Sequence, residues 1–587
     1  MKTNRVIKIF LASSEELEAD RYRFGNLIRK LDNIYEKRGI RIELFEWEDY
    51  DAAYNGMRKQ DEYNERVRAS DMFLALFHKK AGKFTIEEFN IARKAFDEQA
   101  SPKIYTYIKD LEAGESESRE LAEFKRLMLE ELGHYWCRYS NFDTMQLHFV
   151  LQLQMVEATT PIKVEVKESQ VKIGDSTIAD LNNVPFTSEN ATHRELQSRK
   201  EQLDREIGNA ESGGRRGFFG QRSRMTDEEL ANLREERESV TEQIERQEKA
   251  LVDTAMSIAR MQGGECSPRM RTAAELFEKG EIDKAGAVLK EDDMEADATN
   301  AKLKFDTAAQ PTAELTRNIE RCAGEYMLKA RIVVSGIADE SRYRQAVKLM
   351  STAIDLVSGR LPEETLAEYL FDYAVLLTDV GQQTKALETW ERLSGIYERL
   401  YRKAPQKYAY GYAGVLNNMA VLYSDKGDFD HCLSKYLKAV DIYDRLDREG
   451  PGIYDDDIAR LKNNLGTLYS DRDEYNKALS EFNEAARIRF ELLAKDNDPD
   501  SRSALADIYC NMATALQFSD HPQEALRYIA QAHAILDELD KEFPRIYEYK
   551  LYSILNREGS IYTRLDQLDK AEESLQKSLQ LAANLAS

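Results

Sequence analysis

The chain has 587 residues, of which 83 are lysine or arginine and 106 are aspartate or glutamate, giving a formal net charge of −23. This length corresponds to about three or four domains. The negative charge argues against a protein that coats a nucleic-acid backbone, because that function needs clustered cations.

The first 158 residues alternate between strand-like and helix-like segments. Residues 1–13 resemble a signal peptide, but Lys8 divides the apolar stretch, and Val6–Ala12 is therefore predicted to be a buried strand. Such alternation with apolar central strands predicts a parallel sheet covered by helices on both faces. Five units of this kind predict a flavodoxin-like α/β domain over residues 1–158, with ligands at the carboxyl ends of the strands. The other expected strands are 40–45, 72–77, 103–108 and 134–139, and the expected helices are 15–38, 61–69, 85–96, 121–132 and 144–155.

The following segments change character twice. Residues 159–190 contain two short alternating stretches, 163–166 and 171–173, around Gly174 and Asp175, which predict a small β-hairpin linker. Residues 191–262 are predicted to form a coiled-coil helical hairpin, because apolar residues recur at spacings of three, four and seven. The two predicted seams are Leu196, Leu203 and Ile207, and Leu230, Leu233, Val240, Ile244, Leu251 and Ile258.

The connection within this hairpin, residues 213–224, is rich in glycine, arginine and phenylalanine. Arginine combined with aromatic side chains can bind nucleic acid or phosphate. The alternative is a flexible hairpin tip, the kind of segment that tolerates insertions. No part of the chain other than the loop 213–224 is therefore expected to bind nucleic acid. Thr226 and Glu229 predict a capping box at the restart of the helix.

Residues 263–587 are predicted to be all helical and repetitive. Five segments superpose with starts separated by 46, 46, 47 and 46 residues, and each has small residues at its third and fifteenth positions. The pattern resembles tetratricopeptide repeats, although the spacing exceeds the usual period of about 34 residues. Residues 271–289 and 326–356 resemble further, degenerate units. The five segments are Asp372–Leu387, Asn418–Leu433, Asn464–Leu479, Asn511–Leu526 and Arg557–Glu572.

Three segments of the first domain resemble the Toll/interleukin-receptor (TIR)-like domains of bacteria. They are Ile7–Ser14 at the first strand, Ser70–Phe77 at the third strand, and Phe84–Ala92 in the following helix. In enzymatic members of this family, a glutamate early in that helix is the catalytic residue of an NAD glycohydrolase. The stretch Glu88–Ala92 matches the family pattern, without the Trp-Cys pair that often precedes it. The resemblance implies NAD as a substrate. The sequence contains no known cofactor-binding or metal-binding motif, so no cofactor and no metal site are expected.

The chemistry of this reaction suits a carboxylate. Cleavage of the nicotinamide–ribose bond builds oxocarbenium character on the sugar, which a carboxylate can stabilise. Phe89, Ala92 and Phe96 predict the buried stripe of the helix, with Glu88 at its edge and Glu87 on the solvent face. Glu88 is therefore the predicted catalytic residue. The alternative is that both glutamates are first-turn acids favoured by the helix dipole.

Weaker candidates for substrate binding follow the first three strands. Serines at a helix start can bind phosphate or simply cap the helix. Aromatic residues can stack on a base or anchor a loop, and the charged residues are either polar contacts or solvated. A histidine at a strand end can contact a ligand or be structural. These candidates are Ser13 and Ser14, then Trp47, Asp49, Tyr50 and Arg58, and finally His78.

The resemblance implies an effector controlled by a sensor. Bacterial proteins with this domain order resemble defence proteins in which a repeat array controls an NAD-depleting head. An NAD glycohydrolase in antiphage defence is therefore expected, with a protein or peptide trigger bound by the repeats and homo-oligomerisation through the TIR-like domain. Two alternatives stay open: a nucleoside 2-deoxyribosyltransferase-like enzyme with the same layout, and a non-catalytic signalling scaffold that binds protein partners.

The five cysteines and the hydropathy pattern bear on location. The cysteines are widely separated and contain no CxxC pair, so they are expected to be reduced core thiols of a cytoplasmic protein. No run of about eighteen apolar residues is present, and no contact with a membrane is expected.

Overall fold

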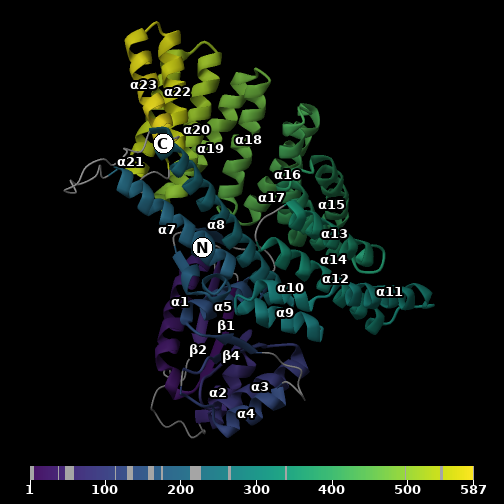
Figure 1. Ribbon diagram of the computed structural model, residues 1–587. Coiled ribbons are helices and arrows are strands. Elements are labelled where there is room, and N and C mark those ends of the chain that lie inside the picture. The colour runs from purple at the N-terminus through teal and green to yellow at the C-terminus, as the bar shows by residue number, and fades with distance from the viewer. Residues whose placement is uncertain are drawn as a thin grey trace, which may run out of the picture. The chain divides into compact units, whose positions relative to one another are not determined.

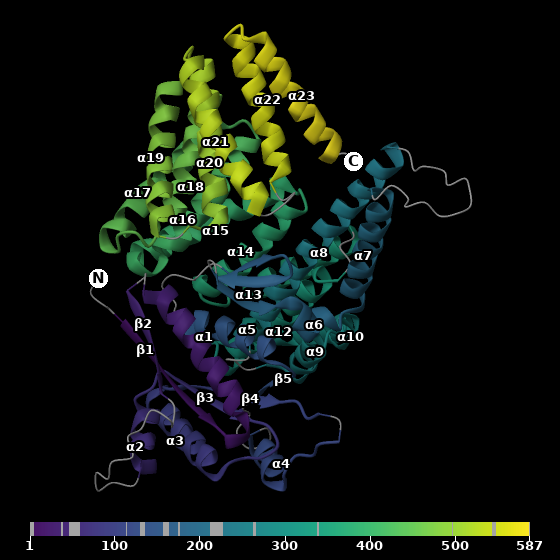
Figure 2. The same ribbon diagram turned by 90° about the vertical axis from the view of Figure 1, so that its left-hand side faces the viewer.

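The computed structural model (Figures 1 and 2) divides the chain into two compact units. Residues 1–193 and 247–291 belong to the α/β unit, and residues 194–246 and 292–587 belong to the helical unit. Within the described residues, no helix is long and apolar enough to cross a membrane. The structure describes residues 5–36, 39–45, 59–112, 114–128, 136–156, 164–173, 176–211, 227–261, 266–336, 340–495, 497–542 and 547–585.

A five-stranded parallel sheet forms the centre of the α/β unit, as the sequence predicted. Its strands are β1 (Arg5–Ser13), β2 (Ile40–Phe45), β3 (Met72–Phe77), β4 (Lys103–Lys109) and β5 (Trp136–Tyr139). Their order in the sheet is β2-β1-β3-β4-β5, with every neighbouring pair parallel. All six residues of β3 are buried, which is the pattern of a central strand covered on both faces.

Helices cover both faces of this sheet (Figures 1 and 2). On one face, α1 (Glu18–Glu36) packs against α5 (Phe142–Val156). The other face carries α2 (Lys59–Arg68), α3 (Lys83–Gln99) and α4 (Arg119–Arg126), which share one apolar core with the sheet. Side chains of β1 alternate between the two faces because successive residues of a strand point in opposite directions.

A small antiparallel sheet follows the parallel one. It contains β6 (Glu165–Lys167), β7 (Gln170–Ile173) and β8 (Ser176–Asp180), in that order. The predicted hairpin is therefore part of a three-stranded sheet, because β8 adds a strand that packs against α5. The β6–β7 turn lies at Glu168 and Ser169, and both have positive φ angles, 53° and 56°. Gly174 and Asp175 lie outside the described residues.

Short helices also belong to the α/β unit. The helices α9 (Pro268–Glu278) and α10 (Ile282–Val288) pack together, as expected for a degenerate repeat, and α6 (Pro185–Ser188) packs against α9. The α9–α10 turn needs Gly280, which has a φ of +77°. A Cβ atom there would lie 2.6 Å from the carbonyl oxygen of Pro185.

The predicted helical hairpin is formed by α7 (Ala191–Glu211) and α8 (Asp227–Met261). Leu203, Val240 and Ile244 form its core, with Leu196 and Leu233 packed against them. The pairs Arg199–Glu236 and Arg237–Asp204, at 2.6 and 3.0 Å, join the two helices. The loop 213–224 and Thr226 lie outside the described residues, so the predictions about them stay predictions.

Helical repeats occupy the rest of the helical unit, where each helix from residue 313 onward packs against the next helix in the chain. This confirms the predicted array of helix pairs. The helices are α11 (Glu291–Thr307), α12 (Ala313–Val334), α13 (Glu340–Val357), α14 (Glu363–Asp379), α15 (Gln383–Lys403), α16 (Pro405–Asp425), α17 (Phe429–Glu449), α18 (Asp455–Asp471), α19 (Tyr475–Lys495), α20 (Pro499–Phe518), α21 (Pro522–Glu542), α22 (Glu548–Arg564) and α23 (Leu568–Leu585).

The small residues of the repeats lie where the paired helices approach most closely. A Cβ atom on Gly466 would lie 2.5 Å from the ring of Phe482, and one on Gly559 would lie 2.7 Å from Leu575 Cγ. Each glycine thus faces a large residue sixteen positions later. The small residues at both repeat positions are buried, and they are Ala374, Ala420, Gly466, Ala513 and Gly559, then Ala386, Cys432, Ala478, Ala525 and Ala571.

We predict opposite effects for two helical glycine substitutions. Gly466→Ala forces its new methyl group into Phe482 and should destabilise the array by about 1–3 kcal/mol through overpacking. Gly414→Ala lies in α16 with open space around its Cβ position, and should stabilise the array by up to about 1 kcal/mol through helix propensity. Urea denaturation followed by far-UV circular dichroism compares the two, and a stabilising Gly466→Ala would contradict this packing.

Candidate functional site

The candidate site lies at the carboxyl ends of β1 and β3, where the chain changes direction across the sheet. After β1 the chain adds β2 on one side, and later adds β3 on the other. The loops after β1 and β3 therefore leave in opposite directions, which opens a crevice between them. Open parallel α/β sheets bind their ligands in such crevices.

The loop after β1 is held by a buried arginine. Arg21 is 3 % exposed, and its Nη1 donates to Ser13 Oγ at 2.8 Å and to the Ser14 carbonyl at 2.9 Å. The Ser14 hydroxyl in turn donates to Glu16 Oε1 at 3.4 Å. The two predicted serines thus lie at the site, where Arg21 of α1 and Glu16 engage their polar atoms.

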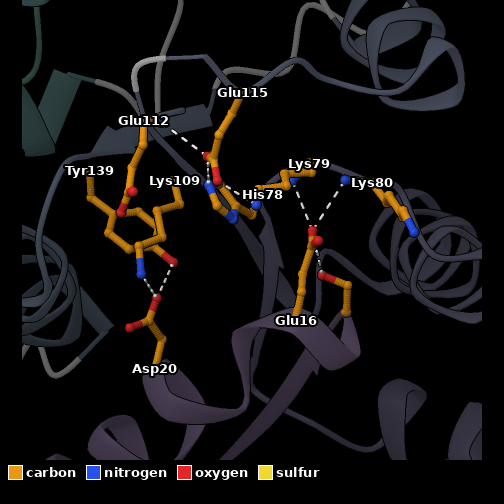
Figure 3. A network of polar contacts seen from close by, with 10 residues as sticks. Glu16, Asp20, His78, Lys79, Lys80, Lys109, Glu112, Glu115 and Tyr139 are labelled. Atoms are coloured by element: carbon orange, nitrogen blue, oxygen red, sulfur yellow. Dashed lines mark hydrogen bonds and ion pairs between the residues drawn. The ribbon is translucent and has the colours of Figure 1, made fainter.

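Glu16 crosses the crevice to the loop after β3 (Figure 3). The backbone N–H groups of Lys79 and Lys80 donate to Glu16 Oε1 at 2.8 and 3.2 Å. Successive backbone N–H groups that converge in this way form an anion-binding nest. The carboxylate of Glu16 occupies it in this structure.

A second carboxylate, Glu115, meets the same loop from the β4 side (Figure 3). It pairs with Lys79 Nζ, lies 3.3 Å from His78 Nε2, and accepts from the Glu112 backbone N–H at 3.0 Å. The hydrogen bond from Lys79 lowers the pKa of Glu115, and the same bond raises the pKa of Lys79. The predicted residue His78 is therefore at the site, beside an acidic partner.

Beneath these contacts lies a buried polar group that joins three elements. Asp20 Oδ2, from α1, receives hydrogen bonds from Lys109 Nζ of β4 at 2.9 Å and from the Tyr139 hydroxyl of β5 at 3.0 Å. Burial, and secondarily the charge of Asp20, raises the pKa of Tyr139. These contacts tie α1 to the carboxyl ends of β4 and β5.

Glu88 lies on the inward face of α3. It is 7 % exposed and shares that face with Thr85 and Phe89. Because α3 begins at Lys83, its first turn contains no acidic residue, so the first-turn explanation does not apply. Glu87 is half-buried and accepts from Asn64 Nδ2 at 3.2 Å, so the prediction that it faces solvent was wrong.

The structure corrects one further expectation about α3, and it does not describe four other predicted residues. Phe96 is 45 % exposed, and the buried stripe runs instead through Thr85, Glu88, Phe89, Ala92 and Ala95. The helix therefore turns Glu88 further inward than its sequence spacing indicated. Four predicted substrate contacts lie outside the described residues, namely Trp47, Asp49, Tyr50 and Arg58.

A cavity of about 770 Å³ adjoins the site within the α/β unit. His78 and Lys109 line it together with aromatic residues Trp136, Phe186 and Phe277. No local sequence pattern reveals this cavity, because its walls come from β4, β5, α4, α5, α6, α8 and α9, which are far apart along the chain. Glu88 is not among its lining residues.

The five cysteines are free thiols in the structure. Cys137, Cys322, Cys432 and Cys510 are buried free thiols, as expected, whereas Cys266 is only half-buried. Burial raises the pKa of the Cys266 thiol to about 11. A thiol with a raised pKa is a poor nucleophile at neutral pH, so none of these observations assigns Cys266 a reactive role.

The C-terminal residues of the chain match a known protein family. Residues 552–585, which lie in α22 and α23, match the tetratricopeptide repeat family. The helix pair α22–α23 is therefore a tetratricopeptide-type repeat, at the end of an array of packed helix pairs. No curated protein sequence matches the chain.

Several solved structures resemble parts of this chain distantly. BtubC from P. vanneervenii is 19 % identical, with 41 % of this chain and 92 % of that chain covered and a TM-score of 0.34. Aspartyl phosphate phosphatase F from Bacillus subtilis is 13 % identical, with 66 % and 94 % covered and a TM-score of 0.31. The quorum sensor NprR from B. thuringiensis is 10 % identical, with 66 % and 99 % covered and a TM-score of 0.28. Likenesses this distant carry no argument about a ligand.

We predict that the buried group around Asp20 stabilises the site. Asp20→Asn removes the charge opposite Lys109 and should destabilise the α/β unit by about 1–3 kcal/mol, since Lys109 is itself partly exposed. Tyr139→Phe removes one hydrogen bond and should cost about 1 kcal/mol. Urea denaturation monitored by tryptophan fluorescence measures both, and an Asp20→Asn variant as stable as wild type would contradict the assignment.

Proposed function

We propose that the tetratricopeptide-type array binds a protein or peptide partner, and that the α/β unit is the effector that this partner controls. Stacked helix pairs form an extended surface, which a compact domain does not offer. The observation that carries the proposal is a row of polar contacts between the first helices of successive pairs, α18, α20 and α22.

This row joins helices that are one repeat apart. Asn511 Nδ2 of α20 donates to Asn463 Oδ1 of α18 at 3.1 Å. Lys550 of α22 donates to Asp507 of α20 at 2.6 Å, and Arg557 donates to Thr514. The amides and cations of this row suit the backbone carbonyls and carboxylates of an extended peptide. The proposed partner is therefore an extended, acidic segment.

Selection from an unbiased peptide library tests this function. Purified wild-type chain should enrich acidic sequences that share a motif, and the Lys550→Ala/Arg557→Ala double variant should lose that enrichment. A matched control, Lys541→Ala/Arg445→Ala, removes the same charge from exposed positions of the second helices α21 and α17. Equal enrichment by the two double variants would contradict a binding surface on the first helices.

For the effector we propose cleavage of NAD, with Glu88 as the catalytic carboxylate. The strand order β2-β1-β3-β4-β5 is that of flavodoxin-like sheets, which supports ligand binding beside β1 and β3. Glu88 is a nearly buried acid in the helix that follows β3, and its position matches the TIR-like pattern. A role in bacterial antiphage defence, with self-association of the α/β unit, completes this proposal.

We predict that Glu88→Gln abolishes NAD loss. The substitution keeps the side-chain shape and removes the charge that would stabilise an oxocarbenium ion. Glu87→Gln is the matched control and should retain activity, because Glu87 bonds to Asn64 on the neighbouring helix. Bacteria that express each variant are assayed for NAD content, and the purified chains are incubated with NAD and, separately, with deoxynucleosides.

Three outcomes separate the candidate functions. NAD loss with Glu88→Gln as fast as with wild type would overturn the catalytic assignment. Exchange of the base on a deoxynucleoside would favour the deoxyribosyltransferase alternative. Absence of both reactions in the presence of a peptide that the array enriched would favour a scaffold.

A further inference from the structure

The crevice between β1 and β3 contains groups that bind anions, and the chain's own carboxylates fill them. Lys79 and Lys80 turn two successive backbone N–H groups toward Glu16 Oε1, at 2.8 and 3.2 Å. The ammonium group of Lys79 faces Glu115, which also lies 3.3 Å from His78 Nε2. Carboxylate and phosphate oxygens use the same donors, because both are anionic acceptors.

The location of these groups is that of a ligand site. Glu16 belongs to the loop after β1, whereas Lys79 and Lys80 belong to the loop after β3, so the Glu16 contact spans the topological switch point. Open α/β sheets bind phosphate-bearing ligands at that point.

The carboxylate of Glu16 is positioned to be displaced. Glu16 is exposed, and its hydrogen bonds are made at the surface. Charged contacts at a surface hold weakly, because water and salt screen them. A phosphate group carries more charge and more acceptor oxygens than a carboxylate, and it can therefore compete for the same donors.

We propose that the backbone N–H groups of Lys79 and Lys80, with the side chains of Lys79 and His78, form a phosphate-binding site that Glu16 and Glu115 occupy until a nucleotide displaces them. The ligand class is a nucleotide with a pyrophosphate group, and only this choice rests on the proposed cleavage of NAD. The acidic side chains then set an affinity threshold. An internal competitor lowers the apparent affinity by the fraction of time for which the site is open.

Titration of the full chain with inorganic pyrophosphate, followed by calorimetry at low salt, tests the site. Glu16→Ala should bind pyrophosphate at least about tenfold more tightly than wild type, which corresponds to a site that is open about a tenth of the time. Glu18→Ala is the matched control. It removes the same charge from an exposed position two residues along, at the start of α1, without opening the nest.

A double variant and a second opening variant complete the test. Lys79→Met introduced into Glu16→Ala should reverse most of the gain, because it removes the ammonium group but leaves the backbone in place. Glu115→Gln should also tighten binding, and it does not alter the loop after β1. Far-UV circular dichroism confirms that each chain is folded.

The result that overturns the proposal is pyrophosphate binding by folded Glu16→Ala no tighter than by Glu18→Ala. Tighter pyrophosphate binding without NAD cleavage by any variant would leave the phosphate site standing and remove the proposed enzyme. NAD cleavage that depends on Glu88, with no effect of Glu16→Ala on pyrophosphate binding, would do the reverse. ADP-ribose in place of pyrophosphate shows whether the rest of a nucleotide adds affinity.

Discussion

The parallel pairing of β1 with β3 is the constraint on which the chemistry of the α/β unit depends. β1 and β3 are neighbours although β2 lies between them in the chain, so their carboxyl-end loops diverge and leave a crevice. Parallel strands bring these ends to the same edge of the sheet. The crevice therefore collects groups from residues 13–21 and 78–80, and the loop around Glu115 adds its carboxylate.

A different constraint organises the helical unit. Each pair of helices needs a small residue opposite a larger one, because the helix axes can approach only where no side chain intervenes. Gly466 facing Phe482 and Gly559 facing Leu575 show this rule at the same separation of sixteen residues. One local rule, applied again and again, produces a long surface. Its first helices also carry the polar side chains that join neighbouring repeats, such as Asn463 and Asn511.

The sequence predicted the elements well because their signals are local. A buried strand such as Met72–Phe77 is recognised from its own run of apolar residues, and the repeats are recognised from small residues that recur at a fixed spacing. The contact of Glu16 with Lys79 could not be predicted from the sequence. It joins residues far apart in the chain and uses backbone donors that no side-chain pattern reveals. Phe96 was misplaced because helical periodicity cannot tell where α3 passes the edge of the core.

The net charge of −23 and an anion site in the same chain are compatible for a physical reason. Charges separated by more than about 8 Å are largely screened at physiological salt, whereas groups in hydrogen-bond contact are not. An anion in the crevice therefore responds mainly to the two N–H groups, the ammonium of Lys79 and the carboxylates that compete for them. Local donors decide whether the anion binds, and the distant acidic surface mainly slows its approach. A predominantly acidic protein can in this way bind a phosphate group with its backbone, provided that its own carboxylates release the site.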